Sequence, residues 1–215
     1  MKQLFLLLAV LAVMVNMSAA QHLQQELLSG AEKMVFQATF SQQVDQESDS
    51  RINGLAFFNR FHDPAKQAFD EAVIQTSVTG SFSKHFSAGP KLFYSSVAGL
   101  QPGILLNAHS NIAGFDIKLS PQLAYNVPSE AIQAGITLLI QKMVPINRQW
   151  AIGANAFLMG SWLRFETHDR SIIQARIGPV YDQRFQFGIS YDLDQYSSQI
   201  SQQDQFGLFV RALFN

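Results

Sequence analysis

The chain has 215 residues, no cysteine, and 15 Lys and Arg against 16 Asp and Glu. The lack of cysteine excludes disulfides, thiolate metal sites and cysteine nucleophiles. The balanced charge excludes the basic footprint of a nucleic-acid-binding protein. Only 14% of the residues are charged, whereas an ordinary soluble domain has about 25%. Low charge together with 18 Phe and 5 Tyr favours a membrane barrel, because such barrels carry girdles of aromatic residues.

Residues 1–20 have the pattern of a secretory signal peptide that is cleaved after residue 20. Lys2 precedes an apolar run over residues 4–15, and residues 18–20 are the small residues of a cleavage site. A transmembrane anchor is the alternative, but this run is shorter than the ~20 residues that a spanning helix needs. No cysteine follows the run, which excludes a lipoprotein anchor. We therefore predict an exported protein of a Gram-negative cell.

The mature chain divides into an N-terminal segment, residues 21–33, and a single barrel domain, residues 34–215. The first segment has a weak pattern and is expected to lie in the periplasm as a short helix or an ordered tail. In the barrel domain apolar residues recur at every second position, which is the period of a β-strand. Most of the segments with this pattern are as long as a tilted membrane-spanning strand. They are residues 34–41, 52–61, 74–83, 87–97, 104–112, 115–126, 132–141, 150–162, 173–181, 185–192 and 206–214.

A single-chain bacterial barrel is expected to have an even number of strands. We therefore predict an all-β fold, an antiparallel up-and-down transmembrane β-barrel of about ten strands and at most about twelve. Either residues 34–41 are used outside the wall, or one further strand is hidden in the chain.

Residues 115–126 show the alternation most clearly, with apolar residues and Pro121 on one face and polar or small residues on the other. A soluble β-sandwich also alternates and is the alternative. The polar faces of this chain, however, carry mainly Ser, Gly, Gln and Asn rather than the charged residues that usually meet water. Aromatic residues on the apolar faces also gather near strand ends, as in a membrane girdle. The expected girdle residues are Tyr125, Trp150, Trp162, Tyr181, Tyr191 and Phe214.

The expected connections alternate between short turns and longer loops. Short turns are expected at 84–85, 113–114, 144–148 and 182–184, and longer loops at 62–71, 98–103, 127–131, 166–170 and 194–204. Short turns usually face the periplasm in outer-membrane barrels. Asn215 is therefore expected in the periplasm, with the last strand running inward.

The expected inner face carries charges of both signs. These lumen residues are Lys91, His109, Asp116, Lys118, Arg176, Asp192 and Arg211. Because buried charges must be paired, one interpretation is a salt-bridged plug that fills a narrow lumen. The other is a small polar channel. Side chains fill the interior of an eight-stranded barrel, and a barrel of about ten strands is only slightly wider. General diffusion of large solutes through its lumen is therefore excluded.

Residues 107–114 resemble the His-x-Ser-Asn-Ala-Gly element of outer-membrane lipid A deacylases, in which His and Ser act as base and nucleophile. Here His109 and Ser110 are adjacent, so a strand points them to opposite faces. Hydrolase activity is therefore the weakest of the functional hypotheses. The histidines are scattered without metal-ligand spacing, and no phosphate-binding glycine motif or cofactor signature occurs.

The part of the chain from Leu119 to about Ile200 resembles the PorP/SprF-type membrane proteins that are associated with type IX secretion and gliding in Bacteroidota. The resemblance rests on SPQLAY at 120–125 with Gln133, RQWAIGA at 148–154, and RFQFGISYDL at 184–193. It implies an outer-membrane barrel that works with secretion components.

The sequence thus yields three functional hypotheses for an outer-membrane barrel. The first is a non-enzymatic structural or accessory protein of a secretion or surface assembly. The second is a narrow pore for small solutes, and the third is a lipid-modifying hydrolase. The expected partners are outer-membrane lipid and other envelope or secretion proteins, with no cofactor, metal or nucleic acid.

Overall fold

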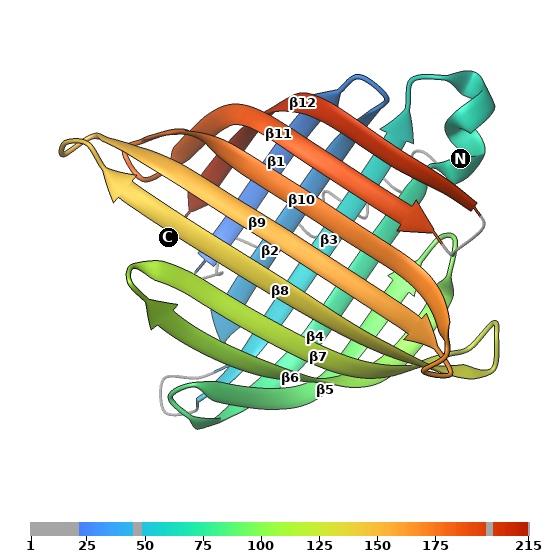
Figure 1. The fold of residues 1–215 in the computed structure, drawn as a ribbon. Coiled ribbons are helices and arrows are strands. Elements are labelled where there is room, and N and C mark those ends of the chain that lie inside the picture. Colours follow the sequence, from blue (N-terminus) through green and yellow to red (C-terminus); the bar gives the residue numbers. More distant parts are fainter. Residues whose placement is uncertain (1–21, 45–48, 197–199, 215) are drawn as a thin grey trace.

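In a computed structural model, residues 22–44, 49–196 and 200–214 form a single closed antiparallel barrel (Figure 1). Each strand pairs with its chain neighbours, and the first pairs with the last. No helix in these residues has the length and apolar character needed to cross a membrane. The elements are β1 (His22–Gly30), β2 (Lys33–Gln43), β3 (Ser50–Phe61), η2 (Pro64–Phe69), β4 (Glu71–Ser83), β5 (Phe86–Ser95), β6 (Gly99–Ile112), β7 (Phe115–Asn126), β8 (Ala131–Pro145), β9 (Trp150–Leu163), β10 (Thr167–Tyr181), β11 (Phe185–Tyr196) and β12 (Ile200–Phe214).

The predicted all-β barrel is confirmed, but the described residues contain twelve strands rather than about ten. The strand that sequence reasoning missed is β1, which we had placed in a periplasmic segment. β1 closes the barrel by pairing with β2 and β12. Its pattern was weak because Leu28 faces the lumen, where it packs with Val35 and Phe209, so that apolar residues occur on both faces. Residues 34–41 belong to the wall as part of β2, and the predicted signal peptide lies outside the described residues.

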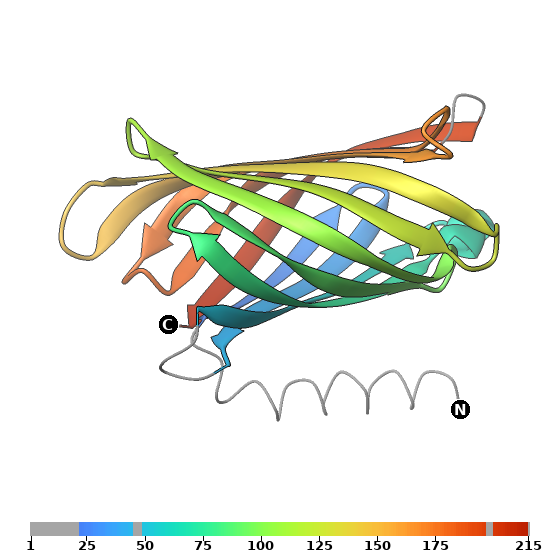
Figure 2. The same ribbon diagram turned by 90° about the horizontal axis from the view of Figure 1, so that it is seen from below.

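The strands end at two rims (Figure 2). The terminal rim holds the start of β1 and the ends of the even-numbered strands, and the η2 rim holds η2 and the ends of the odd-numbered strands. Three of the loops that we expected to be long are mostly strand, because β6 begins at Gly99, β10 at Thr167 and β12 at Ile200. Their charges had suggested loops, but a polar lumen accepts charged residues such as Arg170 and Asp194 on the inner face of a strand.

The short 3₁₀ segment η2 covers part of the η2 rim. Asp63 caps it by accepting a hydrogen bond from the Ala65 backbone N–H at 2.9 Å. The Lys66 ammonium of η2 donates to the Glu32 carboxylate in the β1–β2 turn, and this hydrogen bond raises the pKa of Lys66. The segment is therefore tied to the neighbouring turn at the barrel edge.

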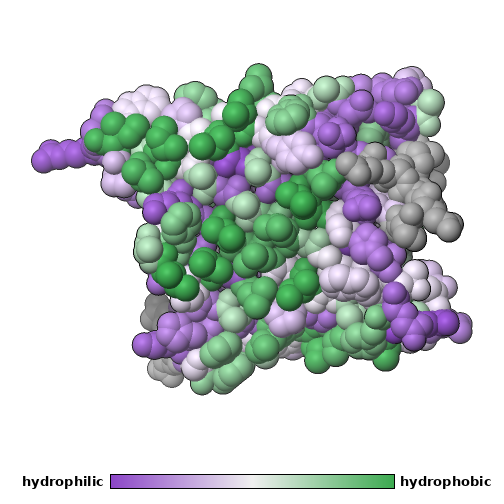
Figure 3. All heavy atoms as spheres, viewed as in Figure 1, coloured by the Kyte–Doolittle hydropathy of each residue, from purple (hydrophilic) through white to green (hydrophobic). Residues whose placement is uncertain are grey.

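The outer face of the wall is apolar between the two rims. Phe206, Leu208 and Ile189 leave 73%, 67% and 60% of their surface exposed, and their neighbours on the same face are also apolar. Figure 3 shows apolar side chains gathered across the middle of the molecule, with hydrophilic residues at both rims. An apolar surface of this extent is unfavourable in water and suits the hydrocarbon of a bilayer.

Five of the six aromatic residues expected in girdles stand on the outer face at strand ends. Trp150 and Tyr181 pack with ring centroids 4.8 Å apart at the terminal rim, where Phe214 ends β12. Tyr125 and Trp162 lie near the η2 rim. The sixth, Tyr191, lies within β11 rather than at its end, because β11 continues to Tyr196 instead of ending at residue 192. Its ring packs against that of Phe206 on β12, with the ring centroids 5.0 Å apart.

Two facing glycines lie where the backbones of β10 and β11 approach closely. A Cβ on Gly178 would lie 2.0 Å from the Phe187 carbonyl oxygen, and one on Gly188 would lie 2.1 Å from the Ile177 carbonyl oxygen. No side chain fits at such distances, and strand glycines commonly mark tight bends at barrel corners.

Candidate functional site

The lumen is asymmetric, with one side filled and the other open. On the filled side, near the closure between β1 and β12, Leu28, Val35 and Phe209 are buried and pack together with Phe57. A network of charged side chains lies on the same side of the barrel. The open side is a cavity lined mainly by the strands from β3 to β9.

The centre of the filled side is a carboxylate held by two arginines. Glu26 of β1 accepts from Arg176 Nε at 2.9 Å and from Arg211 Nε at 2.8 Å. Arg176 Nη1 also donates to Asp192 at 2.5 Å. These four side chains are at most 7% exposed. Each charge is therefore compensated, as burial requires.

A second group of charges crosses the lumen near the η2 rim, and we call it the crossbar. Arg170 of β10 forms two hydrogen bonds with the Asp194 carboxylate, at 2.9 and 2.7 Å. Its third bond, 2.8 Å long, reaches Glu71 on β4. β10 and β4 are six strands apart in either direction around the barrel. The Arg170–Glu71 pair thus joins opposite walls, and Lys33 supports it at 3.8 Å from Asp194.

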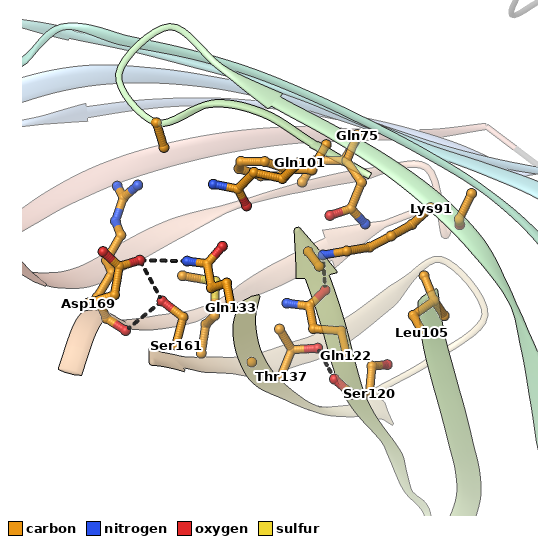
Figure 4. A pocket seen from close by; sticks show the side chains of 18 of the residues that line it. Gln75, Lys91, Gln101, Leu105, Ser120, Gln122, Gln133, Thr137, Ser161 and Asp169 are labelled. Carbon is orange, nitrogen blue, oxygen red and sulfur yellow. Dashed lines mark hydrogen bonds between the residues drawn. The ribbon is translucent and has the colours of Figure 1, made fainter. Parts of the chain in front are cut away.

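The open side contains a cavity of about 360 Å³ beside the crossbar. Figure 4 shows side chains that line it. Most of its polar lining residues carry amides or hydroxyls; they are Asn53, Gln75, Ser77, Gln101, Asn107, Ser120, Gln122, Gln133, Thr137 and Ser161. A surface of this composition can exchange hydrogen bonds with water and with small polar solutes.

Three polar contacts fix the cavity wall. Lys91 Nζ donates to Gln122 Oε1 at 2.5 Å. On the other side, Asp169 accepts from Gln133 Nε2 at 2.6 Å and from Ser161 Oγ at 3.1 Å. Asp169 reaches this position because the β9–β10 register shifts there, between His168 and Arg170.

The polar track continues from the cavity toward the terminal rim. Lys118 lines the cavity and stands opposite His109 in the β6–β7 pairing. The His109 ring is hydrogen-bonded to the Asp116 carboxylate, and these side chains are 53% and 49% exposed. The pair therefore lies in a wet mouth of the lumen rather than in its packed centre.

The geometry does not form a His–Ser catalytic pair. Ser110 is the residue after His109 and pairs in register with Ile117, an outer-face residue of β7. His109 therefore faces the lumen while Ser110 faces outward, as the strand period predicts. Among the residues that the structure describes, no three His, Cys, Asp or Glu side chains come together as a metal site.

The predicted lumen residues all lie on the inner face, but they form three separate groups. Arg176, Asp192 and Arg211 belong to the paired network, whereas Lys91 and Lys118 line the cavity. His109 and Asp116 form the third group, at the mouth. Both interpretations of the lumen, plug and channel, thus have a counterpart in a different part of the barrel.

Sequence reasoning missed five charged residues of the networks. They are Glu26, Lys33, Glu71, Arg170 and Asp194. All five lie in segments that we had assigned to the periplasmic segment or to loops. A signal was present for Asp194, because it stands two positions after Asp192 and therefore shares its face in an extended strand.

Comparison with known proteins supports the architecture alone. No family model matches the chain, and no curated protein matches it, so the resemblance to PorP/SprF-type proteins receives no support from either. Among solved structures, the KdgM porin is similar with a TM-score of 0.52 and 10% identity over 90% of this chain and 99% of that one. The NanC porin has a TM-score of 0.50 and 9% identity, with the same coverage. The chain therefore has the fold of an outer-membrane barrel.

Proposed function

We propose that the protein is an outer-membrane barrel with a narrow, off-centre pore for small polar solutes. The observation that carries the proposal is the cavity of about 360 Å³ on the open side of the lumen. Its polar lining continues through Lys118 to the half-exposed His109 and Asp116 at the terminal rim. A barrel that served only as a scaffold would need no such polar track.

The paired charges restrict this pore. The network around Glu26 fills the lumen beside β1 and β12, and the crossbar divides it near the η2 rim. Solutes would therefore pass along β4 to β9, where amides and hydroxyls replace part of their hydration shell. The similar structures that are named porins are consistent with this function. In bacterial barrels the first strand usually begins and the last strand usually ends on the periplasmic side. We therefore place the terminal rim in the periplasm.

The accessory function in secretion was our leading hypothesis from the sequence. No feature of the described wall carries it, and the cavity favours the pore instead. Hydrolase activity is not proposed, because His109 and Ser110 face opposite sides of the wall.

Proteoliposome swelling tests the pore and its size limit. Vesicles that contain the refolded protein are expected to swell in an isosmotic pentose such as arabinose, and not in the trisaccharide raffinose. Vesicles with the same protein denatured before reconstitution serve as the control. The absence of arabinose swelling, with the protein shown to be folded by its heat-modifiable gel migration, would contradict the proposal. Equal rates for both sugars would contradict the narrow bore.

A further inference from the structure

The outer wall of the barrel contains a groove that the proposed pore does not use. Its volume is about 390 Å³, and its lining residues come from the strands β7 to β12. Most of these residues belong to the apolar outer face, so the groove opens toward the bilayer and not toward the lumen. The strands β8 to β11 form the near wall of the molecule in Figure 1.

Three alanines form the floor of this groove. Ala156 on β9 stands directly opposite Ala175 on β10, and Ala154 lies two positions away on the same face of β9. The residues that continue the register beyond Ala156 and Ala175 are larger, with Ile140 on β8 and Tyr191 on β11. Small side chains between large ones leave a depression in the surface of the wall. The groove therefore follows from the sizes of paired residues on neighbouring strands.

The groove runs from the terminal rim toward the middle of the wall. Its rim end is at Phe115, the first residue of β7. Its other end is at Phe206, near the middle of β12, where the Phe206 ring packs against that of Tyr191. The register across β8 to β11 connects the two ends. An apolar chain in the groove would thus extend from the membrane surface toward the hydrocarbon interior.

The rim end of the groove carries a cation. Lys142 on β8 pairs with Phe115 in the register, and its ammonium lies 4.0 Å from the centre of the Phe115 ring. The ammonium donates to the Ala113 carbonyl oxygen at 3.3 Å. Among the ion pairs of the described residues, none includes Lys142. Because an ammonium group has three donors, Lys142 can still bind a negatively charged group at this end.

We propose that the groove binds one anionic phospholipid, with its phosphate at Lys142 and an acyl chain over the alanine floor. The acyl chain suits the apolar lining, and the phosphate accepts a charge-assisted hydrogen bond from the ammonium. Basic groups at a membrane surface attract anionic headgroups. The terminal rim, which we place in the periplasm, adjoins the leaflet of the outer membrane that consists of phospholipids. The site is separate from the proposed pore and does not depend on conduction.

Native mass spectrometry of the refolded full chain in a neutral detergent tests this site, with dioleoyl phosphatidylglycerol and dioleoyl phosphatidylcholine as probes. The wild type is expected to retain one phosphatidylglycerol per barrel, several-fold more often than phosphatidylcholine. Lys142→Met should remove this preference, because methionine keeps much of the side-chain length without the charge. Ala175→Leu should reduce the retention of both lipids several-fold, because the larger side chain occupies the floor of the groove.

Two matched controls lie outside the groove. Lys84→Met removes the same charge from the β4–β5 turn at the same rim, and Ala134→Leu enlarges an outward-facing alanine of β8 that pairs with Trp162. Both variants should bind the lipids like the wild type, and all variants are first shown to be folded by heat-modifiable gel migration. Equal retention of the two lipids by the wild type, an unchanged preference in Lys142→Met, or an equal loss in Ala134→Leu and Ala175→Leu would overturn the site.

Discussion

Replacing Glu26 with glutamine is expected to lower the free energy of unfolding by about 3–5 kcal/mol, the usual effect of removing one partner from a buried ion pair. Glu26 is 4% exposed and accepts from both Arg176 and Arg211. After the substitution, Asp192 is the carboxylate that remains bonded in this network. Two guanidinium groups would then share one carboxylate in a packed lumen, and the excess positive charge would lose its compensation.

Urea titration of the refolded protein, followed by the fluorescence of Trp150 and Trp162, measures this effect. Glu166→Gln, the same change in an exposed turn at the η2 rim, should leave the midpoint nearly unchanged. The double variant Glu26→Gln with Arg211→Gln should lose less than the sum of the two single losses, because the two groups interact directly. Strictly additive losses, or a midpoint for Glu26→Gln equal to that of the wild type, would contradict the paired network.

Removing both ends of the crossbar with Glu71→Ala and Arg170→Ala is expected to raise single-channel conductance several-fold. These side chains meet from opposite walls at 2.8 Å, so their loss opens the cavity toward the filled side of the lumen. Asp194 would keep Lys33 as its partner at 3.8 Å. Because both members of the pair are removed, no new unpaired charge is left in the lumen, and the barrel should still fold.

Planar-bilayer recording in potassium chloride compares this double variant with the wild type. The matched control is Glu32→Ala with Lys66→Ala, which removes an ion pair of the same charges between the β1–β2 turn and η2. That pair is more than 40% exposed and lies at the rim, so the control should conduct like the wild type. An unchanged conductance in the crossbar variant would show that the pair does not limit the passage.

The alternation of residues was enough to predict the wall. Phe115 and Tyr125 stand on the outer face of β7 and Asp116 on the inner face, as the strand period requires. Prediction failed for β1, because Leu28 packs inside the lumen and Glu26 is neutralised by arginines that are at least 150 residues away in the chain. The local sequence pattern of β1 shows neither the packing of Leu28 nor the pairing of Glu26. Strand number, and with it the diameter of the barrel, therefore could not be derived from periodicity alone.

The candidate site was predictable only in part for a related reason. Periodicity tells which face a side chain occupies, but not its height along the barrel axis, which depends on the stagger of all the strands. Arg170 and Glu71 are 99 residues apart in sequence and meet only because the closed barrel brings β10 and β4 to opposite walls. The separation of Lys91 and Lys118 from the paired network has the same origin.

Single-channel recording of the wild-type protein in a planar bilayer tests the central claim, a narrow pore beside a charged crossbar, most directly. The refolded barrel is expected to produce discrete current steps that are well below those of porins with 16 to 18 strands, which enclose an open aqueous channel. A folded, inserted barrel that produces no current steps would contradict the claim, and so would steps as large as those of a wide porin.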